Sequence, residues 1–78
     1  MAILLTGGLG FIGSHIAVKL LTHNYEVVII DNLYNSKLST LKNIKKITNS
    51  NNITFYNLDL CHNINQVFER HNISAVIH

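Results

Sequence analysis

The sequence reads Thr6-Gly7-Gly8-Leu9-Gly10-Phe11-Ile12-Gly13-Ser14 between two apolar segments. Residues 2–5, which precede this stretch, are continuously apolar, as in a buried parallel strand. The segment that follows has its apolar residues at helical spacing. A strand, a glycine-rich turn and a helix in this order are the setting in which glycines bind the pyrophosphate of a dinucleotide.

Three glycines spaced three apart have separate tasks in such a turn. Gly7 can adopt the backbone angles that the chain needs to leave the strand sharply. Gly10 lacks a Cβ, so the main chain can approach a pyrophosphate closely, and Gly13 lets the helix pack closely against its strand. The free amides around Phe11 and Ile12 then face the phosphates, where the helix dipole adds to the attraction.

The spacing of these glycines differs from the commonest fingerprint, Gly-x-Gly-x-x-Gly, and Gly8 is an additional glycine. A glycine triplet by itself also fits an ordinary strand–helix turn. The context favours dinucleotide binding, because Asp31 closes the next apolar run roughly 20 residues further on, where a ribose-binding acid is expected. A carboxylate at the ribose favours NAD and repels the extra phosphate of NADP, although Lys37 offers that phosphate some counter-charge.

Length and composition are typical of one small globular domain. The chain has 78 residues, of which 47% are hydrophobic, so a packed core is expected. The formal charge of +2 is mild. The one dense basic cluster, Lys42, Lys45 and Lys46, is interpreted as the solvated face of a helix. We therefore expect no nucleic-acid partner.

Several absences favour a cytoplasmic protein. Cys61 is the single cysteine, so no internal disulfide can form, as is usual in a reducing compartment. The N-terminal apolar run is too short for a signal peptide. No stretch approaches the ~20 apolar residues of a membrane span, so no membrane partner is expected. The histidines and Cys61 lack a ligand-like arrangement, and no metal is predicted.

The pattern along the chain predicts the order βαβαβαβ. Strands are expected at 2–6, at 26–30, at 53–57 and, as the beginning of a fourth, at 75–77. Helices are expected at 11–22, after a cap at Ser36 or Ser39, and after a capping box that begins at Asn63. Right-handed crossovers turn this order into the N-terminal part of a Rossmann-type doubly wound parallel sheet, an α/β fold with strand order 3-2-1-4.

Each helix is expected to bury one apolar stripe. In the first helix the stripe is Ile12, Ile16 and Leu20, with Ala17 and Leu21 beside it. The stripes of the other two helices are predicted as Leu41, Ile44 and Ile47, and as Ile64, Val67 and Phe68.

The glycine turn, extended as far as His15, resembles the N-terminus of the extended short-chain dehydrogenase/reductase superfamily, which includes NAD-dependent epimerases and dehydratases. The loop Asp31-Asn32-Leu33-Tyr34-Asn35-Ser36 is more discriminating, and it resembles that of the UDP-glucose 4-epimerase family. The turn Leu58-Asp59-Leu60 and the closing Val76-Ile77-His78 match in order and spacing. The resemblance covers all 78 residues, but only the front of the family's usual length.

The resemblance implies NAD as the cofactor and assigns its contacts by position. The amides of Phe11 and Ile12 would meet the pyrophosphate, and Asp31 would accept hydrogen bonds from the adenosine ribose. Asp59 would contact the adenine amino group, with Leu60 against the ring. The cofactor-binding set is Gly7, Gly10, Phe11, Ile12, Gly13, Asp31, Asn32, Leu33, Tyr34, Asn35, Ser36, Asp59 and Leu60. Asn, Asp and Ser are also common turn formers, so an ordinary turn is an alternative at Asn32, Asn35, Ser36 and Asp59.

The resemblance also implies an activity, the interconversion of UDP-galactose and UDP-glucose by transient hydride transfer. The family's chemistry uses a Tyr-x-x-x-Lys pair, and here each of the three tyrosines has an aliphatic residue four positions later. We therefore assign no catalytic residue. Residues 1–78 are expected to be the N-terminal part of an NAD-binding domain, without the catalytic and UDP-sugar-binding parts and inactive alone. Family members are often dimers, so a homodimer is implied for the full-length protein.

Two alternatives remain at this point. The chain could come from another NAD-dependent sugar-nucleotide epimerase, decarboxylase or dehydratase of the same superfamily, because the glycine turn and the acid are shared. It could also be a truncated nucleotide-binding remnant without catalysis.

Overall fold

A computed structural model describes residues 2–33, 36–58 and 64–77. Strands and helices alternate along these residues, in the predicted βαβαβαβ order. The elements are β1 (Ala2–Thr6), α1 (Phe11–Thr22), β2 (Glu26–Ile30), α2 (Leu38–Thr48), β3 (Ile53–Tyr56), α3 (Ile64–Arg70) and β4 (Ile73–Ile77). Two strand boundaries differ from the prediction: β3 ends one residue earlier, at Tyr56, and β4 begins two residues earlier, at Ile73.

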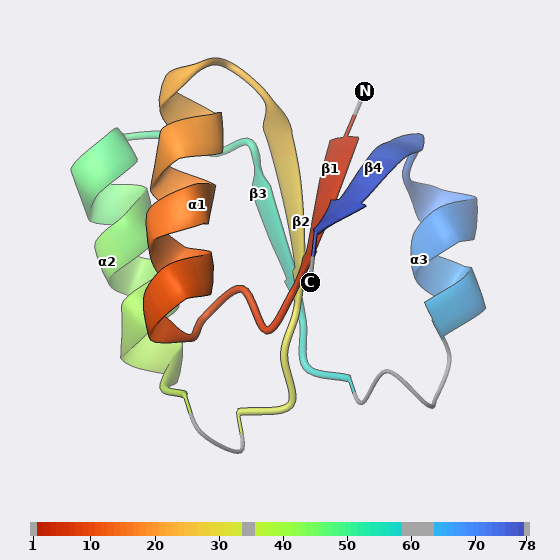
Figure 1. Ribbon diagram of the computed structural model, residues 1–78, viewed down its shortest axis with the longest axis horizontal. Helices are drawn as coiled ribbons and strands as arrows, with labels where there is room; N and C mark the ends of the chain where they lie inside the picture. The colour runs from red at the N-terminus through yellow and green to blue at the C-terminus, as the bar shows by residue number, and fades with distance from the viewer. Residues whose placement is uncertain (1, 34–35, 59–63, 78) are drawn as a thin grey trace.

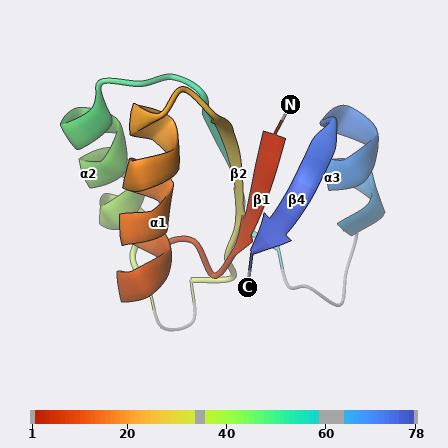
Figure 2. The same ribbon diagram turned by 45° about the horizontal axis from the view of Figure 1, so that its top comes forward.

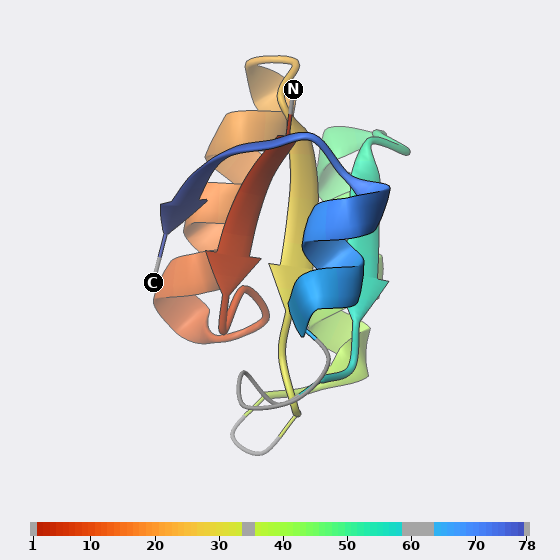
Figure 3. The same cartoon turned by 90° about the vertical axis from the view of Figure 1, so that its right-hand side faces the viewer.

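The strands form one parallel sheet in the order β3-β2-β1-β4, which confirms the predicted topology. Leu4 of β1 lies opposite Val28 of β2 on one side and Val76 of β4 on the other. Helices α1 and α2 cover one face of the sheet, and α3 covers the opposite face (Figures 1 and 2). In Figure 3 the twisted sheet is seen with α3 in front of it and with β4 and β3 at its two edges.

Two apolar cores lie on the two faces of the sheet because successive strand residues point to opposite sides. In β1, Ile3 and Leu5 belong to the core under α1 and α2, whereas Ala2 and Leu4 belong to the core under α3. Burial on both faces explains why the two central strands, β1 and β2, contain continuous apolar runs rather than an alternating pattern. None of the helices in the described part of the chain has the length and apolar content that a membrane span requires.

The predicted buried stripe of α1 is wrong. Ala17 and Leu21 are buried, whereas Ile12 is 72% exposed, and Ile16 and Leu20 pack at the margin of the core. Ala17 and Leu21 follow Gly13 at intervals of four residues, on the same side of α1. They face the sheet because α1 approaches the backbone of the turn closely on that side, at Gly13.

The other two helices also bury less than predicted. In α2, Ile44 is buried and Leu41 packs against the core, but Ile47 is 69% exposed. In α3, Val67 is buried and Ile64 packs beside it, while Phe68 is 45% exposed. A spacing of three residues falls roughly 60° short of a full turn, and neighbours lie roughly 100° apart, so these stripes drift off the buried face.

Candidate cofactor-binding site

The glycine turn connects β1 to α1 at the carboxyl edge of the sheet, the lower edge in Figure 1. Gly7 has a φ of +67°, in the left-handed region that favours glycine. Its N–H donates to the carbonyl of Ile30 at 2.8 Å, and the Gly10 N–H donates back to the Gly7 carbonyl at 3.1 Å. The turn is therefore held both to the end of β2 and to itself.

Two further glycines permit close packing around this turn. A Cβ on Gly13 would lie 2.5 Å from the carbonyl oxygen of Gly7 and 2.9 Å from the Cα of Gly8. A Cβ on Gly8 would lie 2.8 Å from the Cγ2 of Ile29, a fully buried residue of β2. The sequence alone did not indicate this role of Gly8, because its partner lies on a neighbouring strand and outside any local motif.

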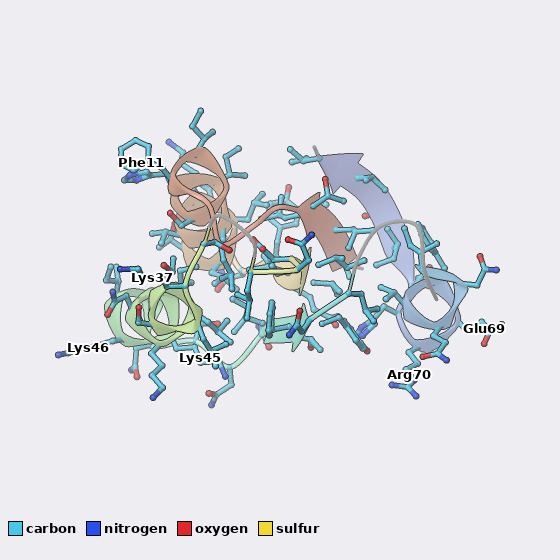
Figure 4. The ribbon with its side chains drawn as sticks, turned by 90° about the horizontal axis from the view of Figure 1, so that it is seen from below. Phe11, Lys37, Lys45, Lys46, Glu69 and Arg70 are labelled. Carbon is cyan, nitrogen blue, oxygen red and sulfur yellow. The ribbon has the colours of Figure 1, made fainter. Side chains whose placement is uncertain are left out.

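The N-terminus of α1 presents backbone donors at the same edge. The Ser14 N–H makes the first bond of the helix type, to the carbonyl of Gly10 at 2.8 Å. The amides of Phe11, Ile12 and Gly13 precede it, and helix geometry offers them no carbonyl acceptor. The side chain of Phe11 points away from the sheet (Figure 4), so it does not cover these amides from the sheet side.

A cleft of about 400 Å³ lies beside these amides. Its lining comes from the ends of β1 and β4, the glycine turn and the first turns of α1: Leu5, Thr6, Gly7, Gly10, Phe11, Ile12, Gly13, Ile16 and Ile77. Free backbone amides at a helix N-terminus are the donors that bind phosphate groups. The residues present therefore fit a pyrophosphate, and the apolar wall of the cleft fits an uncharged ring beside it.

Asp31 lies at the other side of the turn, directly after β2, and only 8% of its surface is exposed. Its Oδ2 accepts a hydrogen bond from the Leu9 N–H at 3.1 Å. Its Oδ1 accepts from the Leu33 N–H and from the Ser36 hydroxyl, both at 2.8 Å. Since β2 and β4 lie on opposite sides of β1, the carboxylate and the cleft flank the glycine turn.

The loop after β2 is organised by this carboxylate. Leu33 has a φ of +62° and packs partly against the larger core, while Asn32 is exposed. The prediction that Ser36 or Ser39 caps α2 is wrong. The N-cap is Lys37, without a side-chain hydrogen bond. The Ser36 hydroxyl donates to Asp31 instead. The structure thus brings Asp31, Leu33 and Ser36 together.

Other predicted positions have different outcomes. Tyr34, Asn35, Asp59 and Leu60, together with the predicted cap Asn63, lie outside the described residues. Lys42, Lys45 and Lys46 are exposed, as expected of a solvated face, and Lys46 projects from α2 away from the sheet (Figure 4). No group of three or more potential metal-ligating side chains occurs within residues 2–33, 36–58 and 64–77.

A cluster that the sequence did not reveal lies at α3. The Tyr56 hydroxyl and the Nε2 of His71 are 2.8 Å apart, and the Nδ1 of His71 lies 3.3 Å from the Oε2 of Glu26. Tyr56 belongs to β3 and Glu26 to β2, and His71 directly follows α3, so the contacts join the end of the helix to the sheet. The cluster lies away from the glycine turn and has a structural role.

A parallel β-α-β unit with a glycine turn at the helix N-terminus and an acid after the second strand is the arrangement of Rossmann-type folds, which commonly bind dinucleotides. The sequence profile of the family described as GDP-mannose 4,6 dehydratase matches residues 4–78. The chain belongs to this family.

Curated relatives cover the whole chain. It is 49% identical over 80 aligned positions to the UDP-glucose 4-epimerase of Bacillus subtilis and 48% identical over 80 to that of Neisseria gonorrhoeae. Both alignments include 100% of this chain but only 23% of the relative, so the chain spans about a quarter of the length of these proteins. The identities confirm the resemblance drawn from the glycine turn and the loop after β2.

Solved structures agree with this placement. The UDP-glucose 4-epimerase from Bifidobacterium longum, in complex with NAD+ and UDP, superposes with a TM-score of 0.95 at 35% identity, over 100% of this chain and 24% of that one. The enzyme from Stenotrophomonas maltophila, with bound NAD and formylated UDP-arabinopyranose, superposes at 0.92 with 38% identity and the same coverage.

Proposed function

We propose that this chain is the NAD-binding N-terminal part of an enzyme that interconverts UDP-galactose and UDP-glucose. The observation that carries the proposal is the Asp31 carboxylate, placed after β2 and joined to the glycine turn by the Leu9 amide. The relatives named UDP-glucose 4-epimerase, nearly half identical over the whole chain, support this substrate pair over others in the family.

Residues of this chain would hold the cofactor at two places. The amides of Phe11 and Ile12 bind the pyrophosphate, and Asp31 accepts hydrogen bonds from the adenosine ribose, with Asn32 and Ser36 beside it. A buried carboxylate at the ribose repels the extra phosphate of NADP, so the cofactor is NAD. Of the predicted positions outside the described residues, Asn35 would line the ribose end, and Asp59 would contact the adenine amino group with Leu60 against the ring. Tyr34 is proposed only as a member of the cofactor-binding set.

The chemistry needs further groups. When bound, NAD accepts a hydride from the sugar and returns it to the opposite face. Residues 1–78 contain no Tyr-x-x-x-Lys pair, so the proton at the sugar hydroxyl is moved by other parts of the full-length protein. Those parts also bind the UDP-hexose. We further propose that the full-length protein is a homodimer in the cytoplasm. The single cysteine of residues 1–78, which allows no disulfide within them, is in keeping with a reducing compartment.

The test uses the native protein that carries this chain. It is incubated with UDP-galactose, and the products are separated chromatographically. We expect UDP-glucose to form, the reverse conversion to proceed from UDP-glucose, and NAD to be released on denaturation. Turnover of neither UDP-hexose by a folded, NAD-containing protein would sink the epimerase proposal.

A second candidate is a dehydratase acting on a sugar nucleotide, which is favoured by the description of the matching family as GDP-mannose 4,6 dehydratase. The same assay with GDP-mannose distinguishes the two, because dehydration removes water and lowers the product mass, whereas epimerisation leaves the mass unchanged. A native protein that binds NAD and turns over no sugar nucleotide would favour the non-catalytic remnant.

A further inference from the structure

We propose that Asp31 is also a positioning residue for the pyrophosphate-binding turn, which it holds in shape through the Leu9 amide. This inference rests on the proposed function, because it assumes that a dinucleotide binds at the glycine turn. It adds a second task to the carboxylate: ribose recognition and phosphate recognition depend on the same side chain.

The Leu9 contact lies at the centre of the turn. Leu9 is buried, with 2% of its surface exposed, and lies between Gly8 and Gly10. Its N–H donates to the Oδ2 of Asp31 at 3.1 Å, across 22 residues of sequence. Gly7, at the start of the turn, is bonded to β2 through backbone atoms. The middle of the turn is bonded to the same strand end through the Asp31 side chain. A substitution at position 31 can therefore remove this contact without changing the backbone.

Both oxygens of the carboxylate accept hydrogen bonds from the protein. A carboxylate has about four acceptor positions on its two oxygens. Leu33 and Ser36 donate to Oδ1, and Leu9 donates to Oδ2. A ribose hydroxyl that reaches Oδ2 therefore shares this oxygen with Leu9. Binding at the ribose and the shape of the phosphate-binding turn are coupled through one atom.

This coupling allows two possible roles of Asp31 to be distinguished. If the carboxylate acted only on the ribose, its substitution would not matter to a nucleotide without ribose hydroxyls. If it also holds the turn, the substitution weakens the binding of even such a nucleotide, because the phosphate-binding amides that follow Leu9 lose their fixed position.

The experiment compares ADP with 2′,3′-dideoxy-ADP on nucleotide-free protein by calorimetry. The variant is Asp31→Asn, which keeps the size of the side chain but offers one oxygen where the donors need two. We expect the substitution to lower the affinity for dideoxy-ADP roughly fivefold, the effect of one lost hydrogen bond, and to lower the affinity for ADP by more. Glu26→Gln is the matched control, since it removes the same charge from the opposite end of β2, and it should leave both affinities within about twofold.

The outcomes are distinguishable. Unchanged dideoxy-ADP affinity in a folded Asp31→Asn variant overturns the positioning role and leaves NAD binding intact, whereas wild-type protein that binds neither NAD nor ADP overturns both proposals. A measurement on the unsubstituted protein guards against a variant that does not fold. The Leu9 amide should exchange with solvent more slowly than those of Phe11 and Ile12, and equal rates would also overturn the role.

Discussion

At the scale of single residues, two glycines of the turn should differ in how much they contribute to stability. A Cβ at position 13 would lie 2.5 Å from the Gly7 carbonyl oxygen, which is backbone and cannot rotate away. Gly13→Ala should therefore lower the free energy of unfolding by about 1–3 kcal/mol, the usual cost of overpacking. A Cβ on Gly10 would lie 3.4 Å from the same oxygen, so Gly10→Ala should cost within about 0.5 kcal/mol. Urea unfolding of the two variants measures both costs, and equal costs would contradict the prediction.

Gly8 tests a contact between elements. Its Cβ would meet the side chain of Ile29 at 2.8 Å, and Ile29 is fully buried. Gly8→Ala should destabilise the protein by about 1–3 kcal/mol, and Ile29→Ala alone by about 2–5 kcal/mol. In the double variant the new methyl group enters space that Ile29 has vacated, so its cost should be less than the sum. Strict additivity in a double-mutant cycle would show that the two residues do not press on each other.

At the scale of elements, the extent of α1 could be predicted but its orientation could not. The glycine turn and the periodic apolar residues predict Phe11–Thr22 correctly. Both sides of this helix carry apolar residues, so periodicity could not decide which side is buried. The close approach at Gly13 decides it, because it directs Ala17 and Leu21 to the sheet and leaves Ile12 outside. Such a contact depends on the three-dimensional position of the turn.

The same limit applies to the loop after β2. Its sequence predicts a ribose-binding acid, and Asp31 stands where expected. It does not predict that the Ser36 hydroxyl and the Leu9 amide both donate to this acid, since these contacts depend on how two loops meet at the edge of the sheet. Sequence motifs identify the residues of the candidate site, and the hydrogen bonds among them require the fold.

The contact between α3 and the sheet carries a prediction of its own. The Tyr56 hydroxyl bonds to His71, at the end of this short helix, and His71 in turn contacts Glu26. Tyr56→Phe should lower the free energy of unfolding by about 1 kcal/mol and speed amide exchange in Ile64–Arg70. The control, Tyr25→Phe, removes a hydroxyl from a residue that is 40% exposed and should have little effect on either measurement. Equal effects of the two substitutions would exclude a specific role for the Tyr56 hydroxyl.

At the scale of the whole molecule, the described residues bury the two faces of the sheet unevenly. The core beneath α1 and α2 is the larger one, and the core beneath α3 contains the buried residues Ala2, Leu4, Val28, Ile30 and Val67. Large apolar side chains remain on the surface, with Phe11 82% and Ile12 72% exposed. Small domains bury a smaller fraction of their surface than large ones. A polypeptide of residues 1–78 should therefore be marginally stable and bind NAD weakly, with a Tm below ~60 °C.

Ligands should raise this Tm according to which end of the cofactor they carry. The candidate contacts of this chain lie at the adenosine ribose and the pyrophosphate, so most of the affinity for NAD should be retained by ADP. A ligand present at about 100 times its Kd adds roughly 2.7 kcal/mol to the stability of the state that binds it. NAD and ADP should thus raise the Tm progressively with concentration, whereas nicotinamide mononucleotide, which keeps one phosphate but lacks the adenosine end, should raise it less. Calorimetric scans at increasing ligand concentration provide the measurement. A shift with nicotinamide mononucleotide as large as that with ADP would show that Asp31 is not part of the main binding site. A cooperative transition above ~60 °C without ligand would contradict the expected marginal stability.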